Sequence, residues 1–544
     1  MASNVSIAYF SAEIGFSPNV PTYSGGLGVL AGDHLKASAD LGLPICGITL
    51  LYREGYVKQK LDNNGTQTEF YPKFHPRNLL KKLPIELSIK LRGNDVKIAV
   101  WEYKLRGVGF KTVPIYFLDT DVKENKKKDR KITRRLYSGG PTMRCLQEAI
   151  LGIGGVKLIE QLGHEIETYH MNEGHSAFLT LALKEKYGSD EEVKKRCVFT
   201  THTPVPAGHD IFDTKLVKEI LGNYFKKRIN KSFPKSKLNM THLALYFARY
   251  ANGVSKLHGE VSREMFPKDE IDSITNGIHH LTWHGDETVR LFDKYVSGWK
   301  KNPERLLEAD AIPDKELWKA HQKNKVELLT YANAATQRGF SPDILTIGFG
   351  RRATGYKRAQ LLFSDPERLA KIAGGKLQVI FSGKAHPKDF PGKEIIQEIF
   401  KKSEELFDSI SIAYLENYNM HIGRLITSGV DVWLNTPQRP NEASGTSGMK
   451  AVLNGIPNLS ILDGWWSEGC RHNENGWAIG DHKDSTDKAD ANFLYELLEN
   501  EVIPTYYNDR DKWISLMKEA IKTAVDFTAQ RMVQDYANKS YNLK

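Results

Sequence analysis

The sequence predicts an α/β protein with two Rossmann-like, doubly wound domains, and two observations support this fold class. Short β-rich runs that end in glycine or polar residues alternate with helical patterns, which is typical of parallel sheets covered by helices on both faces. These runs form two separate series along the 544 residues. Because a domain holds roughly 150 residues, that length accommodates both series.

The first series lies in the N-terminal half, and the second lies beyond residue 340. The strands expected in the first are VSIAYFSAE, PICGITLLY, KIAVWEY, VPIYFLDT, ETYHMNEG and CVFTTHTP. Those expected in the second are ILTIGFG, LQVIFSG, SIAYLENY, VDVWLN and IPNLSIL. A charged segment of helical period, 286–334, separates them without a Gly/Ser linker, so we expect domains 1–285 and 286–544. The final helical stretch, 511–541, can pack on either domain.

Composition excludes several classes of protein. Hydrophobic residues make up 40% and charged residues 26%, as in ordinary globular proteins. No apolar run approaches the ~18–20 residues that cross a bilayer, and the start lacks a basic leader, so we expect a cytoplasmic protein without a membrane partner. The four cysteines lie far apart, which favours reduced thiols over a disulfide framework or a zinc knuckle.

The net charge of +10 comes partly from one basic run, Lys123–Arg135. Such a run is either a solvated loop or a patch for nucleic acid. No interleaved aromatic residues or known nucleic-acid module accompany it, so we expect no nucleic-acid partner. A basic balance also suits a phosphate-bearing ligand.

A cluster of cations directly follows the predicted strand ILTIGFG. Arg351, Arg352, Lys357 and Arg358 fall within eight residues. A strand–glycine–helix turn offers free N–H groups, and adjacent arginines offer paired donors, both suited to phosphate. The alternative is a basic helix face in water, but the arginines come straight after a buried-looking strand, which favours an anion site.

Histidines and acids follow two strands of the first series. His170, Glu173 and His175 suggest a metal site, yet HExxH is absent and no helix carries the histidines at i, i+4, so we expect no metal. Their side chains bond hydroxyl groups well, which favours the lining of a sugar site. His202, Asn276 and Trp283 also fall at predicted strand ends or turns, where they suit a carbohydrate pocket. A Gly25–Gly28 turn opens a helix and admits a ligand close to the backbone.

The segment EASGTSGMK places one amine, Lys450, after a loop of small residues. Gly445 and Gly448 keep this loop free of side chains, while Ser444 and Thr446 are both suited to cap the following helix. The P-loop pattern GxxxxGK[ST] is not present. A desolvated lysine flanked by cations and a helix start is suited to form a Schiff base with a phosphate-bearing aldehyde.

Taken together, these segments resemble the α-glucan (glycogen, starch and maltodextrin) phosphorylases, in their compact archaeal and bacterial branch. The motifs YSGGLGVLAGDHLKASADLGLP, MNEGHSAF, THTPV, TNGI, GYKR, SGKAHP, LENY and EASGTSGMK occur in the family's order. EASGTSGMK is the most specific, because the family attaches pyridoxal 5'-phosphate to its lysine. The resemblance implies two Rossmann-like domains facing across a deep cleft. It also implies a retaining phosphorolysis of α-1,4-glucan to α-D-glucose 1-phosphate, with the cofactor's 5'-phosphate as proton relay.

The resemblance also implies roles for individual residues. Lys450 is the Schiff-base residue, and Arg352 grips inorganic phosphate. The residues implied around the cofactor are Gly26, Trp283, Arg351, Lys357, Tyr418, Thr446 and Ser447. Those implied at the glucosyl unit are Asn276, Tyr356, Glu442, Ser444 and Gly445. His202 faces the anomeric centre with its backbone carbonyl, and His175 lines the cleft, so that Arg352, Lys357, His202 and Glu442 form the catalytic set.

The sequence departs from the family pattern in several respects, and two other functions are open. Ser447–Gly448 replaces the Gly-Asn found before the methionine in many members, and Arg351 stands where many have lysine. The N-terminal extension of the long, regulated members is missing, so we do not expect their regulation. The alternatives are a nucleotide-sugar glucosyltransferase of the synthase type and an inactive glucan-binding relative. The preferred glucan length and the assembly state, including a homo-oligomer, stay open.

Overall fold

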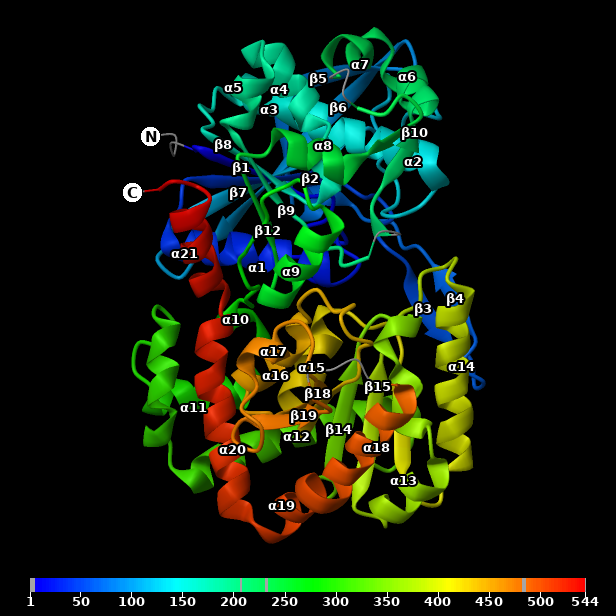
Figure 1. The fold of residues 1–544 in the computed structure, drawn as a ribbon, viewed down its shortest axis with the longest axis vertical. Helices are drawn as coiled ribbons and strands as arrows, with labels where there is room; N and C mark the ends of the chain where they lie inside the picture. The colour runs from blue at the N-terminus through cyan, green and yellow to red at the C-terminus, as the bar shows by residue number, and fades with distance from the viewer. Residues whose placement is uncertain (1–4, 206–207, 230–232, 482–485, 544) are drawn as a thin grey trace. The chain divides into compact units, whose positions relative to one another are not determined.

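The chain folds as two compact units in a computed structural model, which describes residues 5–205, 208–229, 233–481 and 486–543. Unit 1 comprises Met1–Tyr56, Tyr71–Thr275 and Met532–Lys544, and unit 2 comprises Val57–Phe70 and Asn276–Arg531. The division after Thr275 lies ten residues before the boundary that the sequence suggests. Each unit has one large sheet, as the two series of strands predict (Figure 1).

Unit 1 is built on a nine-stranded sheet in the order β13-β12-β9-β8-β1-β2-β7-β6-β5. The strands from β13 to β7 run parallel, and β6 and β5 extend the sheet antiparallel. Their bounds are β1 Ile7–Phe10, β2 Ile45–Leu50, β5 Lys81–Leu91, β6 Asn94–Arg106, β7 Thr112–Asp119, β8 Thr168–Asn172, β9 Cys197–Thr200, β12 Tyr250–Gly253 and β13 Asp272–Ser273. The order reverses between β1 and β8, which makes that edge a switch point.

Helices cover the two faces of this sheet (Figure 1). Helix α1 (Gly26–Leu41) lies on one face, and α2 (Gly140–Ala149), α3 (Gly155–Leu162), α4 (Leu179–Tyr187) and α8 (Met240–Phe247) lie on the other. Smaller elements are α5 Asp190–Lys194, α6 Thr214–Leu221, α7 Asn223–Arg228, α9 Lys256–Met265 and the hairpin of β10 Ile211–Asp213 and β11 Lys237–Asn239. One apolar core joins strands and helices, from Phe10 and Ile48 to Leu179 and Leu243.

Unit 2 is built on a parallel six-stranded sheet in the order β16-β15-β14-β17-β18-β19. The bounds are β14 Leu345–Gly350, β15 Leu377–Ser382, β16 Ser411–Leu415, β17 Val432–Asn435, β18 Asn458–Ile461 and β19 Gly476–Ile479. The order reverses between β14 and β17, so the carboxyl ends of these two strands flank the switch point where such sheets bind ligands. The hairpin of β3 Lys58–Leu61 and β4 Gln67–Phe70 also belongs to this unit.

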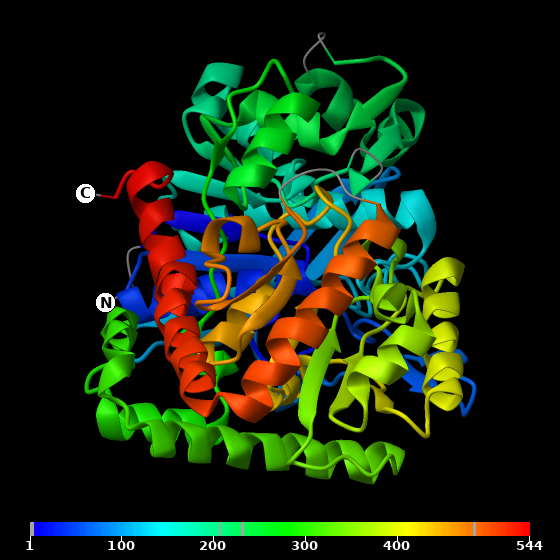
Figure 2. The same cartoon turned by 60° about the horizontal axis from the view of Figure 1, so that its bottom comes forward.

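The helices of unit 2 cover both faces of its sheet. On one face α12 (Asp314–Thr336), the long green helix of Figure 2, packs with α15 (Met420–Gly429) and α16 (Thr446–Leu453) in a single apolar cluster. The other helices include α10 His280–Trp283, α11 Asp286–Tyr295, α13 Pro366–Ala373, α14 Phe390–Glu405, α17 Trp466–Gly469, α18 Asp487–Leu497, α19 Ile503–Asn508 and α20 Arg510–Thr523. The charged segment expected to be helical therefore contains α11 and α12.

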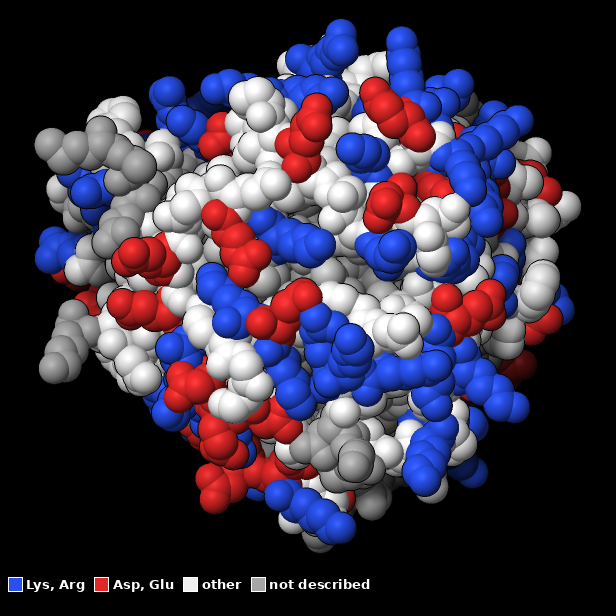
Figure 3. Space-filling model, turned by 90° about the horizontal axis from the view of Figure 1, so that it is seen from above, with Lys and Arg blue, Asp and Glu red and all other residues white. Residues whose placement is uncertain are grey.

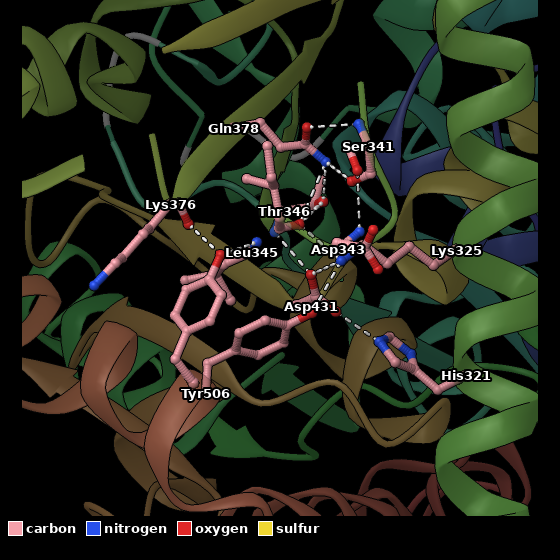
Figure 4. A network of polar contacts seen from close by, with 12 residues as sticks. His321, Lys325, Ser341, Asp343, Leu345, Thr346, Lys376, Gln378, Asp431 and Tyr506 are labelled. Atoms are coloured by element: carbon pink, nitrogen blue, oxygen red, sulfur yellow. Dashed lines mark hydrogen bonds and ion pairs between the residues drawn. The ribbon is translucent and has the colours of Figure 1, made fainter. Parts of the chain in front are cut away.

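A buried ion pair fixes α12 to the amino end of the second sheet (Figure 4). Lys325 Nζ donates to Asp431 Oδ2 at 2.6 Å, and both side chains are fully buried. His321 Nε2 lies 2.7 Å from Asp431 Oδ1, and the Thr346 N–H donates to Asp431 Oδ2 at 2.7 Å. Burial raises the pKa of Asp431, but Lys325 and His321 outweigh burial and lower it. This network lies opposite the edge where ligands are expected, so its role is structural.

The C-terminal segment completes the core of unit 1 through polar contacts. The last helix, α21, spans Ala529–Lys539. The Tyr541 hydroxyl lies 2.7 Å from His170 Nδ1 and 2.9 Å from His34 Nε2. The Tyr536 hydroxyl lies 3.0 Å from Thr200 Oγ1. Burial lowers the pKa of His34 to about 3, so the ring stays neutral and serves this network as a hydrogen-bonding group.

Three arginines of the basic run Lys123–Arg135 pair with acids of their own unit. Arg134 and Arg135 both pair with Glu54, and Arg130 pairs with Asp121. Figure 3 shows basic side chains spread over one face with acidic side chains among them. These pairs support the interpretation of the run as a loop. Among the helices of the described segments, none has the length and apolar character of a membrane span.

Candidate active site at the second switch point

Most of the residues singled out by the sequence lie at the carboxyl ends of the strands of unit 2. Arg351 follows β14 directly, and its N–H donates to Ser382 O at the end of β15 at 2.9 Å. The loop 436–445 follows β17 and leads into α16. Tyr418 follows β16 and Asp463 follows β18. Because these strands are parallel, their ends meet at one edge of the sheet, which brings together residues that are far apart in the sequence.

Glu442 and two predicted cations form a buried cluster at this edge. Glu442 Oε2 accepts a hydrogen bond from Lys357 Nζ at 2.5 Å and another from Arg351 Nη2. The three side chains are at most 10% exposed. Burial raises the pKa of Glu442, but the charges of Arg351 and Lys357 outweigh burial and lower it to about 2. The site therefore holds a full negative charge between two cations at neutral pH.

The surroundings of Tyr356 show that the positive charge extends beyond this cluster. Burial raises the pKa of the Tyr356 hydroxyl, and Lys357, Arg352 and Arg351 together lower it below its usual value. Arg352 itself is exposed, unlike Arg351. Arg352 thus adds to the positive charge around Tyr356.

Arg358, the fourth cation of the cluster, has a structural role instead. Its guanidinium donates to Thr436 O at 2.9 Å and Pro437 O at 2.8 Å, and it pairs with Asp487 and Asp490 at 2.7 Å each. These contacts tie the loop after β17 to α18. The interpretation of all four cations as one anion site is thus wrong for Arg358, because neighbouring carbonyl and carboxylate groups already use its donors.

Lys450 lies on α16 against an aromatic ring. Its Nζ is 3.5 Å from the centre of the Trp283 ring, and the residue is 6% exposed. Tyr418 borders the same region, because a Cβ on Gly423 would meet both the Tyr418 hydroxyl and the Trp283 ring. The N-cap of α16 is Gly445 in the left-handed region, without a side-chain cap. The expectation that Ser444 or Thr446 caps this helix is therefore wrong.

Two residues that sequence analysis did not select organise this site. Asp463 accepts hydrogen bonds from the N–H groups of Glu442 at 2.9 Å and Gly464 at 2.8 Å, which fixes the backbone at Glu442. Burial, followed by the charge of Glu442, raises the pKa of Asp463 to about 7. Asn454 donates to the carbonyls of Trp283 and Lys450, both at 2.9 Å. The signal for Asp463 is an aspartate directly after a predicted buried strand.

Several buried polar atoms at this edge make no hydrogen bond within the part of the chain that the structure describes. They are Arg351 Nη1, Ser444 Oγ and Ser447 Oγ; Asn276 Oδ1, in the segment after β13, is also buried without a hydrogen bond among the described residues. Buried polar groups are rarely left unsatisfied, so such a group of them indicates a polar ligand. A lysine, an aromatic ring, an uncapped helix start and two cations fit an aldehyde that bears a phosphate.

Gly448 explains one departure from the family pattern. A Cβ at Gly448 would lie 2.4 Å from Asn458 Oδ1 and 2.9 Å from the Trp465 ring. The Asn458 amide donates to Gly448 O at 3.2 Å. An asparagine at position 448 therefore has no room here, because the side chains of Asn458 and Trp465 fill the space.

The remaining predicted residues, Gly26, His175 and His202, belong to unit 1. The His202 N–H donates to Glu173 Oε2 at 2.8 Å, and His202 Nε2 lies 2.7 Å from Asn172 Oδ1. Burial lowers the pKa of His202 to about 4, so the ring is neutral. Gly26 starts α1, and the space where its Cβ would lie is open. Gly26 comes after β1 and His175 after β8, the two strands that flank the first switch point, and His202 follows β9, which pairs with β8.

Two family models and several known proteins are similar to this chain in sequence. The family model described as carbohydrate phosphorylase matches residues 210–496, and the model described as starch synthase catalytic domain matches residues 6–275. A maltodextrin phosphorylase of Thermococcus litoralis is 41% identical over 98% of this chain and 70% of its own. A glycogen phosphorylase of Aquifex aeolicus is 38% identical over 98% of this chain and 86% of its own. An uncharacterized protein of Methanocaldococcus jannaschii is 35% identical over 98% and 99%.

The first family model covers more than half of the chain, and both named relatives exceed 35% identity over nearly all of it. The motifs that suggest the resemblance fall at one sheet edge in unit 2 and beside the switch point of unit 1. The chain belongs to the carbohydrate phosphorylase family, which consists of glycosyltransferase enzymes.

Proposed function

We propose that the protein is an α-1,4-glucan phosphorylase, which uses inorganic phosphate to release α-D-glucose 1-phosphate with retention of configuration. The observation that carries this proposal is the buried cationic pair Arg351–Lys357 at the second switch point. This pair already binds the Glu442 carboxylate. Glu442 lies eight residues before Lys450, a buried amine on a helix without a side-chain cap. Such a site suits a reaction in which phosphate groups are bound and cleaved from a sugar.

Pyridoxal 5'-phosphate, held covalently by Lys450, is the cofactor that this site fits best. Trp283, Tyr418, Thr446 and Ser447 would surround its ring, and the residues nearest its phosphate would be Arg351 and Lys357. The start of α16 supports this placement, because uncapped N–H groups and the helix dipole favour an anion. When bound, the cofactor supplies a phosphate group that exchanges protons with the substrate phosphate.

Arg352 is the residue that we assign to the incoming phosphate. Two phosphate groups close together repel strongly in a partly buried site, so the cations offset a repulsion that would otherwise prevent binding. The leaving 4-oxygen of the glucan must gain a proton as the bond breaks, and the substrate phosphate is the donor in this mechanism. No carboxylic acid of the chain is then needed to protonate it.

Glu442 can bind either the two cations or a glucosyl hydroxyl in this mechanism. In the structure its carboxylate occupies the donors of Arg351 and Lys357. A phosphate dianion competes for the same donors and carries more charge, so we expect it to displace the carboxylate. Glu442 is then available to accept a hydrogen bond from a glucosyl hydroxyl, together with Asn276, Tyr356, Ser444 and Gly445. The roles that the resemblance implies for Gly26, His175 and His202 of unit 1 remain predictions.

The decisive experiment is incubation of the purified protein with maltodextrin and phosphate, without any nucleotide. Release of glucose 1-phosphate that depends on phosphate supports the proposal. The match of residues 6–275 to the starch synthase model makes a nucleotide-sugar glucosyltransferase the second candidate. That candidate requires transfer from a nucleotide sugar and no release with phosphate alone. An inactive glucan-binding relative would show neither reaction.

A further inference from the structure

A row of buried and partly buried polar side chains in unit 1 leads to His175. Arg144 and Glu148 lie one turn apart on α2, His175 lies just after β8, and Asp210 lies before β10. His175 Nε2 is 3.2 Å from Asp210 Oδ2, and Arg144 Nη2 is 2.5 Å from the same oxygen. Arg144 also faces Glu148 Oε1 at 3.7 Å. Asp210 is thus the shared partner of a histidine and an arginine.

The two acids of this row differ in protonation. Burial, followed by the charge of Asp210, raises the pKa of Glu148 well above its ordinary value. Burial also raises the pKa of Asp210, but His175 and Arg144 outweigh it and hold that pKa low. A hydrogen bond from protonated Glu148 to Asp210 adds to this rise in the pKa of Glu148. Burial therefore favours the protonated form of Glu148, which is 2% exposed, whereas His175 and Arg144 favour the charged form of Asp210.

The charged Asp210 determines which nitrogen of His175 carries the proton. A carboxylate accepts hydrogen bonds only, so Nε2 must be the donor across the 3.2 Å contact. In a neutral ring Nδ1 is then the acceptor. Nδ1 is buried and has no hydrogen-bond partner in the described parts of the chain. His175 is 8% exposed, so the cost of leaving this atom unsatisfied is substantial until a donor reaches it.

We propose that Asp210, held by Arg144, fixes His175 in the Nε2–H tautomer, so that its Nδ1 accepts a hydrogen bond from a glucan hydroxyl. Asp210, Arg144 and Glu148 are positioning residues, because they act through His175. The nature of the ligand rests on the proposed function, whereas the tautomer rests on unit 1 alone. A negative charge on Glu148 would compete with Asp210 for Arg144, so a protonated Glu148 leaves Arg144 to Asp210.

The tautomer is tested by long-range ¹H–¹⁵N NMR of the full chain labelled in histidine, with His175→Asn to assign the signals. We expect one protonated nitrogen, Nε2, and an unprotonated Nδ1. An Nδ1–H tautomer or a doubly protonated ring at neutral pH would overturn the proposal. Asp210→Ala should remove the preference for the Nε2–H tautomer, because no acceptor then faces Nε2. Glu148→Gln should keep the original tautomer, since its amide is neutral and can donate to Asp210.

The ligand is tested by adding a linear maltodextrin without phosphate. We expect the Nδ1 signal of His175 to shift, and the KM for maltodextrin of Asp210→Ala to rise about tenfold with a smaller change in kcat. Asp272→Asn, at an exposed acid of the same unit, is the control and should change neither value. The expected tautomer without any response to maltodextrin would overturn the assignment of the ligand. If both NMR results are as expected but the wild-type protein shows no phosphorolysis, only the proposed function is contradicted.

Discussion

The amine of Lys450 lies 3.5 Å from the centre of the Trp283 ring, and Asn454 bonds the carbonyl groups of both residues. One asparagine thus fixes the amine and the aromatic face relative to each other. A cation over an indole is attracted by the ring's negative face, so the amine has a defined position before any cofactor arrives.

Lys450→Ala should remove both the near-ultraviolet band of bound pyridoxal phosphate and the phosphorolysis of maltodextrin, because Lys450 is the amine proposed to hold the aldehyde. Absorption spectra and glucose 1-phosphate release measure the two effects. Lys371→Ala, at an exposed lysine of α13, is the matched control. A Lys450 variant that is active and free of cofactor would refute the attachment.

Arg352→Ala should raise the KM for phosphate about tenfold to a hundredfold, since a charged hydrogen bond to the anion is lost. Steady-state kinetics with phosphate as the varied substrate give this value. Arg368→Ala changes an arginine of α13 outside the site and should leave the KM unchanged. An Arg352 variant with wild-type phosphate kinetics would mean that the anion site is misplaced.

Arg358→Ala should act on stability. Removing this guanidinium leaves Asp490, whose side chain is 5% exposed, without its cation, at a cost of about 3–5 kcal/mol. Denaturant unfolding measures the loss. Arg338→Ala breaks a pair with Glu404, which is 63% exposed, and should cost less than about 1 kcal/mol. Equal effects of the two changes would contradict the structural role of Arg358.

Lys325→Met should destabilise unit 2 by about 3–5 kcal/mol, because Asp431 keeps a buried charge with fewer partners. Thermal unfolding followed by circular dichroism tests this. Lys323→Met, two residues away on the same helix, alters an amine that is 54% exposed and should stay within about 0.5 kcal/mol of wild type. A mild effect at position 325 would show that the network in Figure 4 contributes little.

Asp463 should make stability depend on pH between about 4 and 7. Its pKa is raised from 3.8 to about 7 in the folded protein, so its contribution is fully present below pH 3.8 and is lost as the pH rises through 7. The shift of about 3 pKa units corresponds to roughly 4 kcal/mol. Asp463→Asn should be less stable overall, because one backbone N–H loses its acceptor, but should lack this decline. Unfolding at pH 5 and pH 8 compares the two proteins; parallel profiles would contradict the assignment.

The alternation of strands and helices could be predicted from the sequence because buried parallel strands have a strong local signal. All eleven expected runs contain observed strands, from β1 at VSIAYFSAE to β18 at IPNLSIL. The strands β12, β13 and β19 are short and lack a long apolar run, so they were not predicted. The prediction of a side-chain cap for α16 was wrong, because its N-cap is Gly445 in a left-handed conformation, which composition does not reveal.

The site could be predicted only where a motif is contiguous. Arg351, Lys357 and Lys450 each stand in a recognisable segment, and we expected cations near an anion. The pairing of Glu442 with Arg351 joins positions 91 residues apart, which no local pattern predicts. The same holds for Asp210 and Arg144, which are 66 residues apart. Arg358 was misassigned because its partners, Asp487 and Asp490, lie on a distant helix.

The route of the chain imposes an order on synthesis. Tyr536 and Tyr541, which bond Thr200, His170 and His34, are translated after all of the residues of unit 2. The contacts to these histidines therefore form only after every residue of unit 2 has been synthesised. The unit that begins first on the ribosome is the one that finishes last.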